Sequence, residues 1–218
     1  MKSTIYVFFL CLLIEGCAAT ATLKFDPQAL DGQEKVSKDN VEAVVSQKKA
    51  RVTIQPSVGT YTSKDPPTIV VSVCGGQEAF NFSPEDIRVY VDDNPHPIVP
   101  YDEFLTEIKK RERKEIADLE REKDDLLRGA AGSQEQIHYV NAQHQIDVEA
   151  IKTETERSIR DLDATMLKET TVLPRDECGG DVTMERIPNP SQPHEVKVIV
   201  TAAGEEHVFL LNHLMVPQ

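Results

Sequence analysis

The sequence predicts an α+β protein in which an antiparallel β-sandwich is interrupted by a long helical hairpin. Short apolar–polar alternations, separated by Gly, Pro and Asp turns, occupy residues 50–100 and 170–212 and predict strands. A heavily charged segment with helical periodicity occupies residues 101–170. Neither β-rich flank has enough strands for a two-sided core, so we expect strands from both flanks to pair in one domain.

The amino terminus carries the features of an export signal. The unbroken apolar run from Ile5 to Ile14 is too short to span a membrane and is typical of a signal peptide. Gly16 and Cys17 then match the end of a bacterial lipobox, in which the cysteine is acylated. Glu15 departs from the small or apolar residue usual there, so an ordinary secretory signal cut nearby is the alternative. Residues 1–16 are therefore predicted to be a lipoprotein signal peptide, with lipidation at the cysteine.

An acylated cysteine predicts a location in the bacterial cell envelope. Each buried CH₂ of an acyl chain contributes about 0.8 kcal/mol, so several chains give a stable membrane anchor. In bacterial lipoproteins, an aspartate directly after the acylated cysteine favours retention in the inner membrane. This chain has Ala18 at that position, which favours the outer membrane, with the domain facing the periplasm. Residues 17–40 are small and polar without periodicity, and we expect them to form a tether between lipid and domain.

Residues 41–100 and 171–218 are predicted to form the sandwich domain. Residues 51–55 alternate in polarity, whereas Thr68–Cys74 is apolar on nearly both faces, as expected for a central strand. After the insert, the alternation of residues 196–200 predicts another strand, which a tight turn connects to a strand at residues 207–211.

The insert, residues 101–170, reads as two helices. Of the 27 residues from Asp102 to Arg128, 18 are charged, with ten acids and eight bases. Pairs of opposite charge three or four residues apart favour a solvent-exposed helix. An apolar stripe follows one face, with gaps at two charged residues: Leu105, Ile108, Glu112, Ile116, Leu119, Lys123 and Leu126.

The second half of the insert has a clearer stripe, which we call the seam. Glycines near residues 129–133 predict a stop and restart, giving an αα-hairpin with arms of roughly 40 and 50 Å. Two interpretations remain open: a solvated spacer, or a seam that contacts a partner helix, in a second copy or another protein, through Val148, Ile151, Ile159 and Leu162. The seam comprises Ile137, Val140, His144, Val148, Ile151, Thr155, Ile159, Leu162 and Met166.

Two cysteines remain once Cys11 leaves with the signal and Cys17 is acylated. Exported proteins often pair their cysteines, so Cys74 and Cys178 are predicted to form a disulfide that closes a loop around the insert. The chain-entropy estimate for a loop of this length is about 4.7 kcal/mol, as an upper bound. Two buried free thiols are the alternative. A metal site is not expected, because neither cysteine belongs to a Cys-x-x-Cys pair.

The β-rich flanks and the start of the insert resemble a family of uncharacterised bacterial lipoproteins. The resemblance rests on IVVSV at 69–73, FNFSPEDI at 80–87 and YDEFL at 101–105, and on residues 174–182 and 206–209 after the insert. These proteins have an immunoglobulin-like β-sandwich broken by a charged helical segment. The resemblance implies this architecture and no activity, so it contributes no catalytic or binding residue.

Composition and motifs exclude several classes of function. A net charge of −13 and few aromatic residues argue against nucleic-acid binding, which needs a basic surface. The sequence has no nucleophile elbow, phosphate loop or dinucleotide fingerprint, so we expect no cofactor, no catalytic residue and no enzyme. His144 falls on the seam, where it sets register or makes a pH-sensitive contact. His194, His207 and His213 could cluster, although dispersed histidines are more often structural than metal ligands.

The sequence therefore predicts a lipid-anchored structural or adaptor protein that binds another cell-envelope protein, or a second copy, through its helical insert. The alternative is a ligand- or inhibitor-binding module that uses loops of the sandwich. A hydrolase ranks third, because no cluster of titratable residues suggests an active site.

Overall fold

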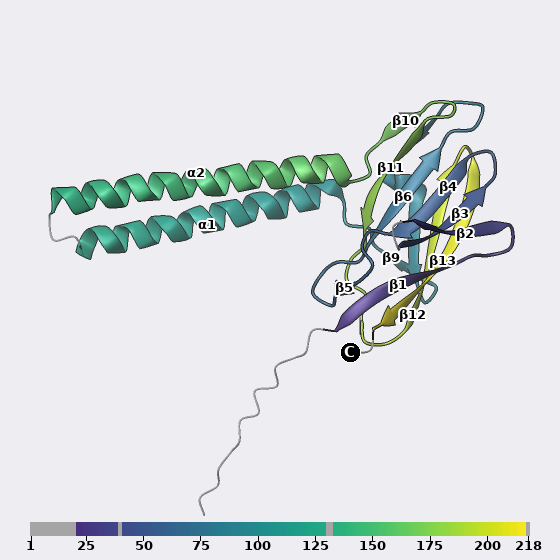
Figure 1. The fold of residues 1–218 in the computed structure, drawn as a ribbon, viewed down its shortest axis with the longest axis horizontal. Coiled ribbons are helices and arrows are strands. Elements are labelled where there is room, and N and C mark those ends of the chain that lie inside the picture. The colour runs from purple at the N-terminus through teal and green to yellow at the C-terminus, as the bar shows by residue number, and fades with distance from the viewer. Residues whose placement is uncertain (1–20, 39–40, 130–132, 217–218) are drawn as a thin grey trace, which may run out of the picture.

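The structure is a computed structural model that describes residues 21–38, 41–129 and 133–216, and it consists of antiparallel sheets and two long helices (Figure 1). The fold class is therefore α+β, as predicted. The predicted signal peptide and the lipidation site Cys17 lie outside the described residues.

Two large antiparallel sheets and one small one account for the strands. The six-stranded sheet has the order β5 (Tyr61–Thr62), β1 (Thr22–Gln28), β13 (Glu205–Met215), β12 (His194–Ala202), β8 (Ile87–Val91) and β9 (Asn94–His96). The five-stranded sheet has the order β11 (Glu177–Thr183), β6 (Thr68–Cys74), β4 (Arg51–Pro56), β3 (Val41–Gln47) and β2 (Gln33–Lys38). The small sheet pairs β10 (Thr170–Val172) with β7 (Phe80–Phe82), which precedes a 3₁₀ turn, Pro84–Asp86.

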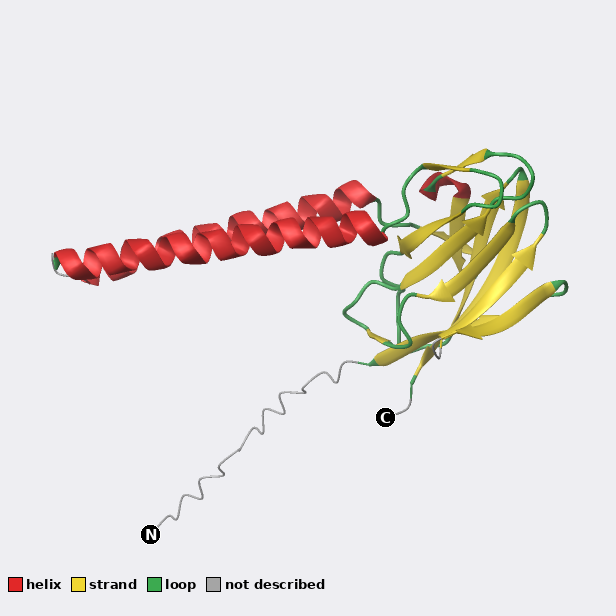
Figure 2. Cartoon of the chain, turned by 45° about the horizontal axis from the view of Figure 1, so that its top comes forward, coloured by secondary structure: helices red, strands yellow, loops and turns green. Residues whose placement is uncertain are grey.

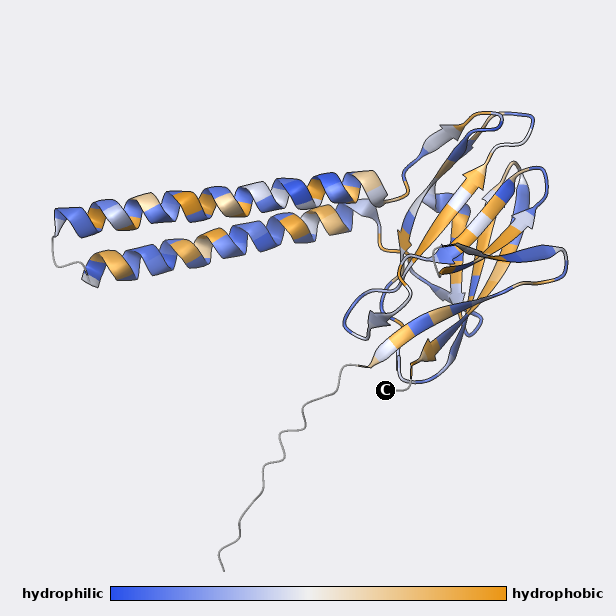
Figure 3. Ribbon diagram, viewed as in Figure 1, coloured by the Kyte–Doolittle hydropathy of each residue, from blue (hydrophilic) through white to orange (hydrophobic). Residues whose placement is uncertain are grey.

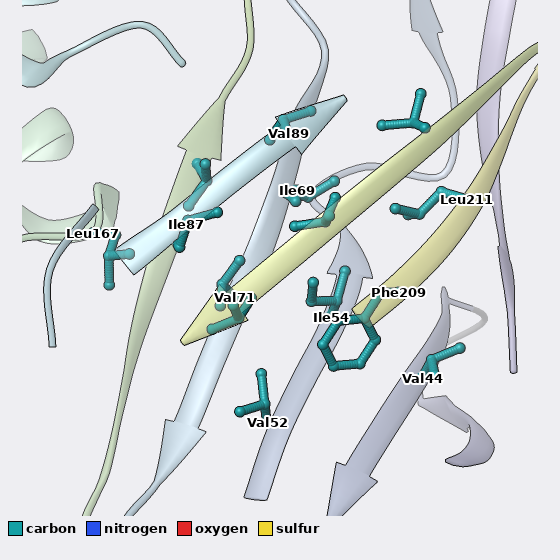
Figure 4. Packing of buried hydrophobic residues seen from close by; sticks show 14 of the residues in the cluster. Val44, Val52, Ile54, Ile69, Val71, Ile87, Val89, Leu167, Phe209 and Leu211 are labelled. Carbon is teal, nitrogen blue, oxygen red and sulfur yellow. The ribbon is translucent and has the colours of Figure 1, made fainter. Parts of the chain in front are cut away.

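The two large sheets enclose one hydrophobic core (Figures 3 and 4). Strand β6 lies inside its sheet, between β11 and β4, as its apolar sequence predicts. Burying one aliphatic side chain contributes about 1.5–3 kcal/mol, so the alternating buried positions determine which face of each strand turns inward. The central contributors are Val52 and Ile54 of β4, Ile69, Val71 and Val73 of β6, Val196, Val198 and Val200 of β12, and Phe209 and Leu211 of β13.

Strands from both sides of the helices pair with each other, which confirms that the flanks form one unit. Strand β11 pairs with β6, β12 pairs with β8, and β10 pairs with β7. In each pair one strand precedes the helices and the other follows them.

The predicted tether over residues 17–40 is wrong for most of its length, because the structure has strands β1 and β2 there. Leu23 and Phe25 of β1 are buried. Strand β1 pairs with β13 from Leu23 to Gln28 and with β5 at its start. The domain therefore begins close after Cys17, rather than near residue 41.

The predicted disulfide is absent, and the strand register gives the reason. Cys74 lies opposite Glu177, and Cys178 lies opposite Val73. Because neighbouring residues of a strand point to opposite faces, the two cysteines lie on opposite faces of the sheet. Both are free thiols, and Cys178 packs against the core. Burial raises the pKa of Cys178, with a smaller contribution from Glu177.

Helices α1 (Tyr101–Gly129) and α2 (Gln134–Thr165) lie side by side and project from the domain (Figures 1 and 2). We call them the helical pair. Their 29 and 32 residues correspond to about 44 and 48 Å at 1.5 Å per residue. Ser133 caps α2 by accepting a hydrogen bond from the Gln136 amide. The second helix ends at Thr165, five residues before the predicted end of the insert.

Candidate functional site

The helical pair is attached to the domain at both ends through a single strand, β11. Before α1, the Val99 amide donates to the Thr183 carbonyl at 2.8 Å. After α2, the Leu167 amide donates to the Asp181 carbonyl at 3.1 Å, and Leu167 is buried. The two attachment points lie two residues apart on β11, the edge strand of the five-stranded sheet, so they fix the base of the helical pair.

Gly180 allows the chain after α2 to approach β11. A Cβ at this position would lie 2.5 Å from the Leu167 nitrogen and 2.7 Å from the Thr165 carbonyl oxygen. Contacts this short with backbone atoms cannot be relieved by rotating a side chain. The glycine is therefore required by the close packing of the helix end on the strand.

A polar clamp joins the two helices at the base. The Tyr101 hydroxyl donates to the Asp163 carboxylate at 2.7 Å, and the Lys168 ammonium donates to the same oxygen at 2.5 Å. The ammonium also lies 4.8 Å from the centre of the Tyr101 ring. The hydrogen bonds from Lys168 and Tyr101 lower the pKa of Asp163, which stays ionised as the shared acceptor.

Two hollows flank this base. One, of about 670 Å³, lies between β8, β9 and the chain after α2. The other, of about 420 Å³, lies between the base of the helices and residues 57–68. Met166 and Asp181 line both hollows, so a ligand in either one would contact the point where the helices join the domain.

The carboxyl group of Asp181 is the most unusual group at this junction. It is partly buried, and its one hydrogen bond among the described residues comes from the Ser57 hydroxyl at 3.2 Å. No Lys, Arg or His of the described chain forms an ion pair with it. Burial raises the pKa of Asp181, and the hydroxyl only partly offsets this effect. The group can accept further hydrogen bonds or bind a cation. Sequence reasoning missed it, since nothing local distinguishes this aspartate.

Along the helical pair, the structure places the predicted seam on the inner face of α2. All nine seam residues are half-buried, while most of their neighbours are exposed. The partner-binding candidates Val148, Ile151, Ile159 and Leu162 are thus covered by α1 of the same chain. They could contact another helix only if the pair opened, so the outer faces are the surface that a partner can reach.

The stripe of α1 agrees with the prediction except at its end. Leu126 is 53% exposed and Leu127 is half-buried in its place. The two charged residues that interrupt the predicted apolar stripe also lie on the inner face of α1. Glu112 is half-buried, and the side chain of Lys123 is 22% exposed.

Three large apolar side chains remain exposed in the distal half of the helical pair. Leu126, Tyr139 and Ile146 are 53%, 68% and 62% exposed. Leu126 and Tyr139 line one hollow beside the connection between the helices. Tyr139 and Ile146 are seven residues apart and share one face of α2. We call these three residues the distal patch. Its exposed residues fall between the seam positions, so the search for apolar periodicity did not reveal it.

Two of the three late histidines do come together. His194 lies opposite His213 in the β12–β13 pairing, with ring centroids 5.7 Å apart, whereas His207 lies elsewhere in the core and bonds Ser46. The nitrogens of His194 face the Asp92 carboxylate at 2.7 Å and the Asn189 carbonyl at 3.1 Å. Burial lowers the pKa of His194, but the contacts with these two acceptors outweigh burial and raise the pKa, which favours the doubly protonated ring.

His213 is the neutral member of this pair. It is 1% exposed and packs against the rings of Phe25 and Tyr61. Burial, together with the nearby charge of His194, lowers the pKa of His213 to about 4. Within the described residues, no group of three or more His, Cys, Asp or Glu side chains is arranged to hold a metal ion.

Comparison with protein-family models, with curated proteins and with solved structures finds no match. In the described part of the chain, no helix is long and apolar enough to cross a membrane.

Proposed function

We propose that this protein is a lipid-anchored envelope lipoprotein whose helical pair is an arm that binds another cell-envelope protein. In this proposal the domain is an immunoglobulin-like sandwich and the arm is an αα-hairpin inserted into it. The anchor is the acylated Cys17, and the outer membrane facing the periplasm is the location that Ala18 favours. The protein acts as an adaptor and not as an enzyme.

One observation carries the proposal: neither helix contains a fully buried residue. The helices cover each other's apolar stripes and meet the domain only at the base, so the core of the domain does not depend on their length. An arm of about 45 Å that is not needed for the core is free to serve as a binding surface. The distal patch adds exposed apolar area, including a tyrosine, a residue type enriched at binding hot spots.

Replacement of residues 105–162 by a short Gly/Ser linker tests the proposal. We expect the domain to keep its cooperative unfolding transition, because its core residues lie in the strands. We also expect the protein to lose its partner in affinity purification from native envelopes. As a control, Leu173, an exposed residue of the domain outside the helical pair, is changed to Ser, which should leave partner capture intact. Capture that survives removal of the arm contradicts the proposal.

A second candidate function is ligand binding at the base of the helical pair. The observation that favours it is the pair of hollows that share the partly buried Asp181. A carboxylate without a basic partner fits a cationic or hydrogen-bond-donating ligand. Under this alternative, the protein without its arm would still bind its ligand, and an Asp181→Asn protein would not.

A further inference from the structure

The folded domain begins only a few residues after the predicted lipid anchor. The Ala21 carbonyl accepts a hydrogen bond from the Ser63 amide at 3.1 Å, and the Thr22 carbonyl accepts one from the Val216 amide at 2.8 Å. The chain is therefore held in the domain from residue 21 onward. A chain spans at most about 3.6 Å per residue, so the Cα of Cys17 lies within about 14 Å of Ala21.

This length is short compared with the domain, so it determines which part of the domain faces the membrane. Strand β5 pairs with the start of β1, and Met215 of β13 pairs with Leu23 beside it. Figure 1 shows β5, the start of β1 and the carboxyl end of the chain at one end of the domain. Arg186, Ile187 and Pro190 line a small hollow together with Leu23 and Tyr61. We call this region the anchored end and define it as residues 21–24, 61–67, 186–191 and 215–216.

The anchored end differs in charge from the rest of the protein. It contains three basic residues, Lys24, Lys64 and Arg186, and one acidic residue, Asp65. The whole chain has 24 basic and 37 acidic residues, so the rest of the chain, with 21 bases and 36 acids, carries a net charge of −15. The Asp65 carboxylate accepts hydrogen bonds from both the amide and the hydroxyl of Thr62. A bilayer containing anionic lipids repels acidic surfaces and attracts basic ones, so this end is the one that suits it.

We propose that the anchored end rests against the phospholipid headgroups, with Lys64 and Met215 at the membrane surface, so that the domain has a fixed side toward the bilayer. The inference rests on the proposed function, because it requires acylated Cys17. The base of the helical pair lines a hollow together with Tyr61 and Asp65. The arm therefore starts beside the membrane surface, and its partner is one that can be reached from there.

The absence of tryptophan from the chain allows a direct test. A single tryptophan is introduced as Met215→Trp at the anchored end, where the native side chain is 49% exposed, or as Leu173→Trp, where it is 51% exposed. The full-length acylated proteins are reconstituted into phosphatidylethanolamine–phosphatidylglycerol vesicles with or without a headgroup nitroxide quencher. We expect the quencher to reduce the fluorescence of Met215→Trp and to leave that of Leu173→Trp unchanged. A Lys64→Trp protein serves as a second probe in case Met215→Trp disturbs β13.

A linker control separates proximity from simple membrane attachment. Twenty Gly/Ser residues inserted between Ala19 and Thr20 span roughly 25 Å on average, which should remove most of the quenching while the protein stays on the vesicles. Mass spectrometry of each protein reports acylation at Cys17. An unmodified Cys17 overturns the anchor and this inference together. Acylated protein in which probes at residues 215, 64 and 173 are quenched equally, or not at all, overturns this inference alone.

Discussion

Changing Gly180 to Ala should loosen the attachment of the helical pair and destabilise the whole domain. The added Cβ would lie 2.5 Å from the Leu167 nitrogen and 2.7 Å from the Thr165 oxygen, about 1 Å closer than ordinary contact. These neighbours are backbone atoms, so relief requires moving the end of α2 away from β11. Overpacking of this kind costs about 1–3 kcal/mol. For a chain of this size, that corresponds to a melting temperature lower by roughly 2–12 °C.

Urea unfolding followed by circular dichroism measures this cost, and Gly59→Ala is the matched control. No atom lies within 4 Å of a Cβ at Gly59, so this control should stay within about 0.5 kcal/mol of the original protein. Cross-linking between the base of the helices and β11 should also weaken in Gly180→Ala alone. If Gly180→Ala is as stable as the original protein and as Gly59→Ala, the end of α2 does not pack closely against β11.

Three further predictions follow from the seam, the buried histidine and the cysteines. Ile151→Asp should place a charge between the helices and destabilise the helical pair by about 1–3 kcal/mol, which faster amide exchange would report. Ile146→Asp changes an exposed residue of the same helix and should not have this effect, so equal effects of the two variants would contradict the assignment of the inner face. Burial lowers the pKa of His213 to about 4 in the folded protein, whereas its pKa in the unfolded chain is about 6.5. Between about pH 6.5 and pH 4, the unfolded chain therefore binds a proton at His213 that the folded protein does not bind. Stability should therefore fall by up to about 3 kcal/mol as the pH drops through this window, and the fall should be smaller in His213→Phe when urea unfolding is compared at pH 7 and pH 4.5. Peptide mapping without reduction should find Cys74 and Cys178 both alkylated as free thiols, and a peptide pair joined by a disulfide would show that the β6–β11 register is wrong.

Much of the helical pair could be predicted from the sequence because its stabilising contacts are local. A seam repeating every three or four residues identifies the inner face of α2 without knowledge of the domain. The end of α1 was harder, because Leu126 and Leu127 are adjacent and both fit an apolar stripe. Only packing against α2 decides that Leu127 turns inward.

The errors concern features that depend on partners distant in sequence. Strand β1 has buried residues at alternate positions, but it contains Pro27 and lies among polar residues, and its pairing partner β13 lies about 190 residues later, so the sequence of this region predicts a tether. The face to which a strand cysteine points depends on register, and a shift of one residue reverses it. Asp181 becomes notable only because the ends of both helices converge on β11.

The correction at the amino terminus also changes the expected behaviour of the protein. A tether of more than 20 residues would allow the arm to search widely for a partner. If Cys17 is acylated as we propose, only three residues separate the anchor from Ala21, and we expect the arm to reach only targets near the bilayer.

Photo-crosslinking in intact cells tests the central claim, that the helical pair binds an envelope partner, most directly. A photoreactive phenylalanine derivative is placed at Tyr139 in the distal patch or at Leu173 on the domain, two side chains that are 68% and 51% exposed. We predict one discrete crosslinked protein from position 139 and none from position 173. Crosslinks that form only from position 173, or no crosslinked product from any exposed position along the helical pair, would contradict the account.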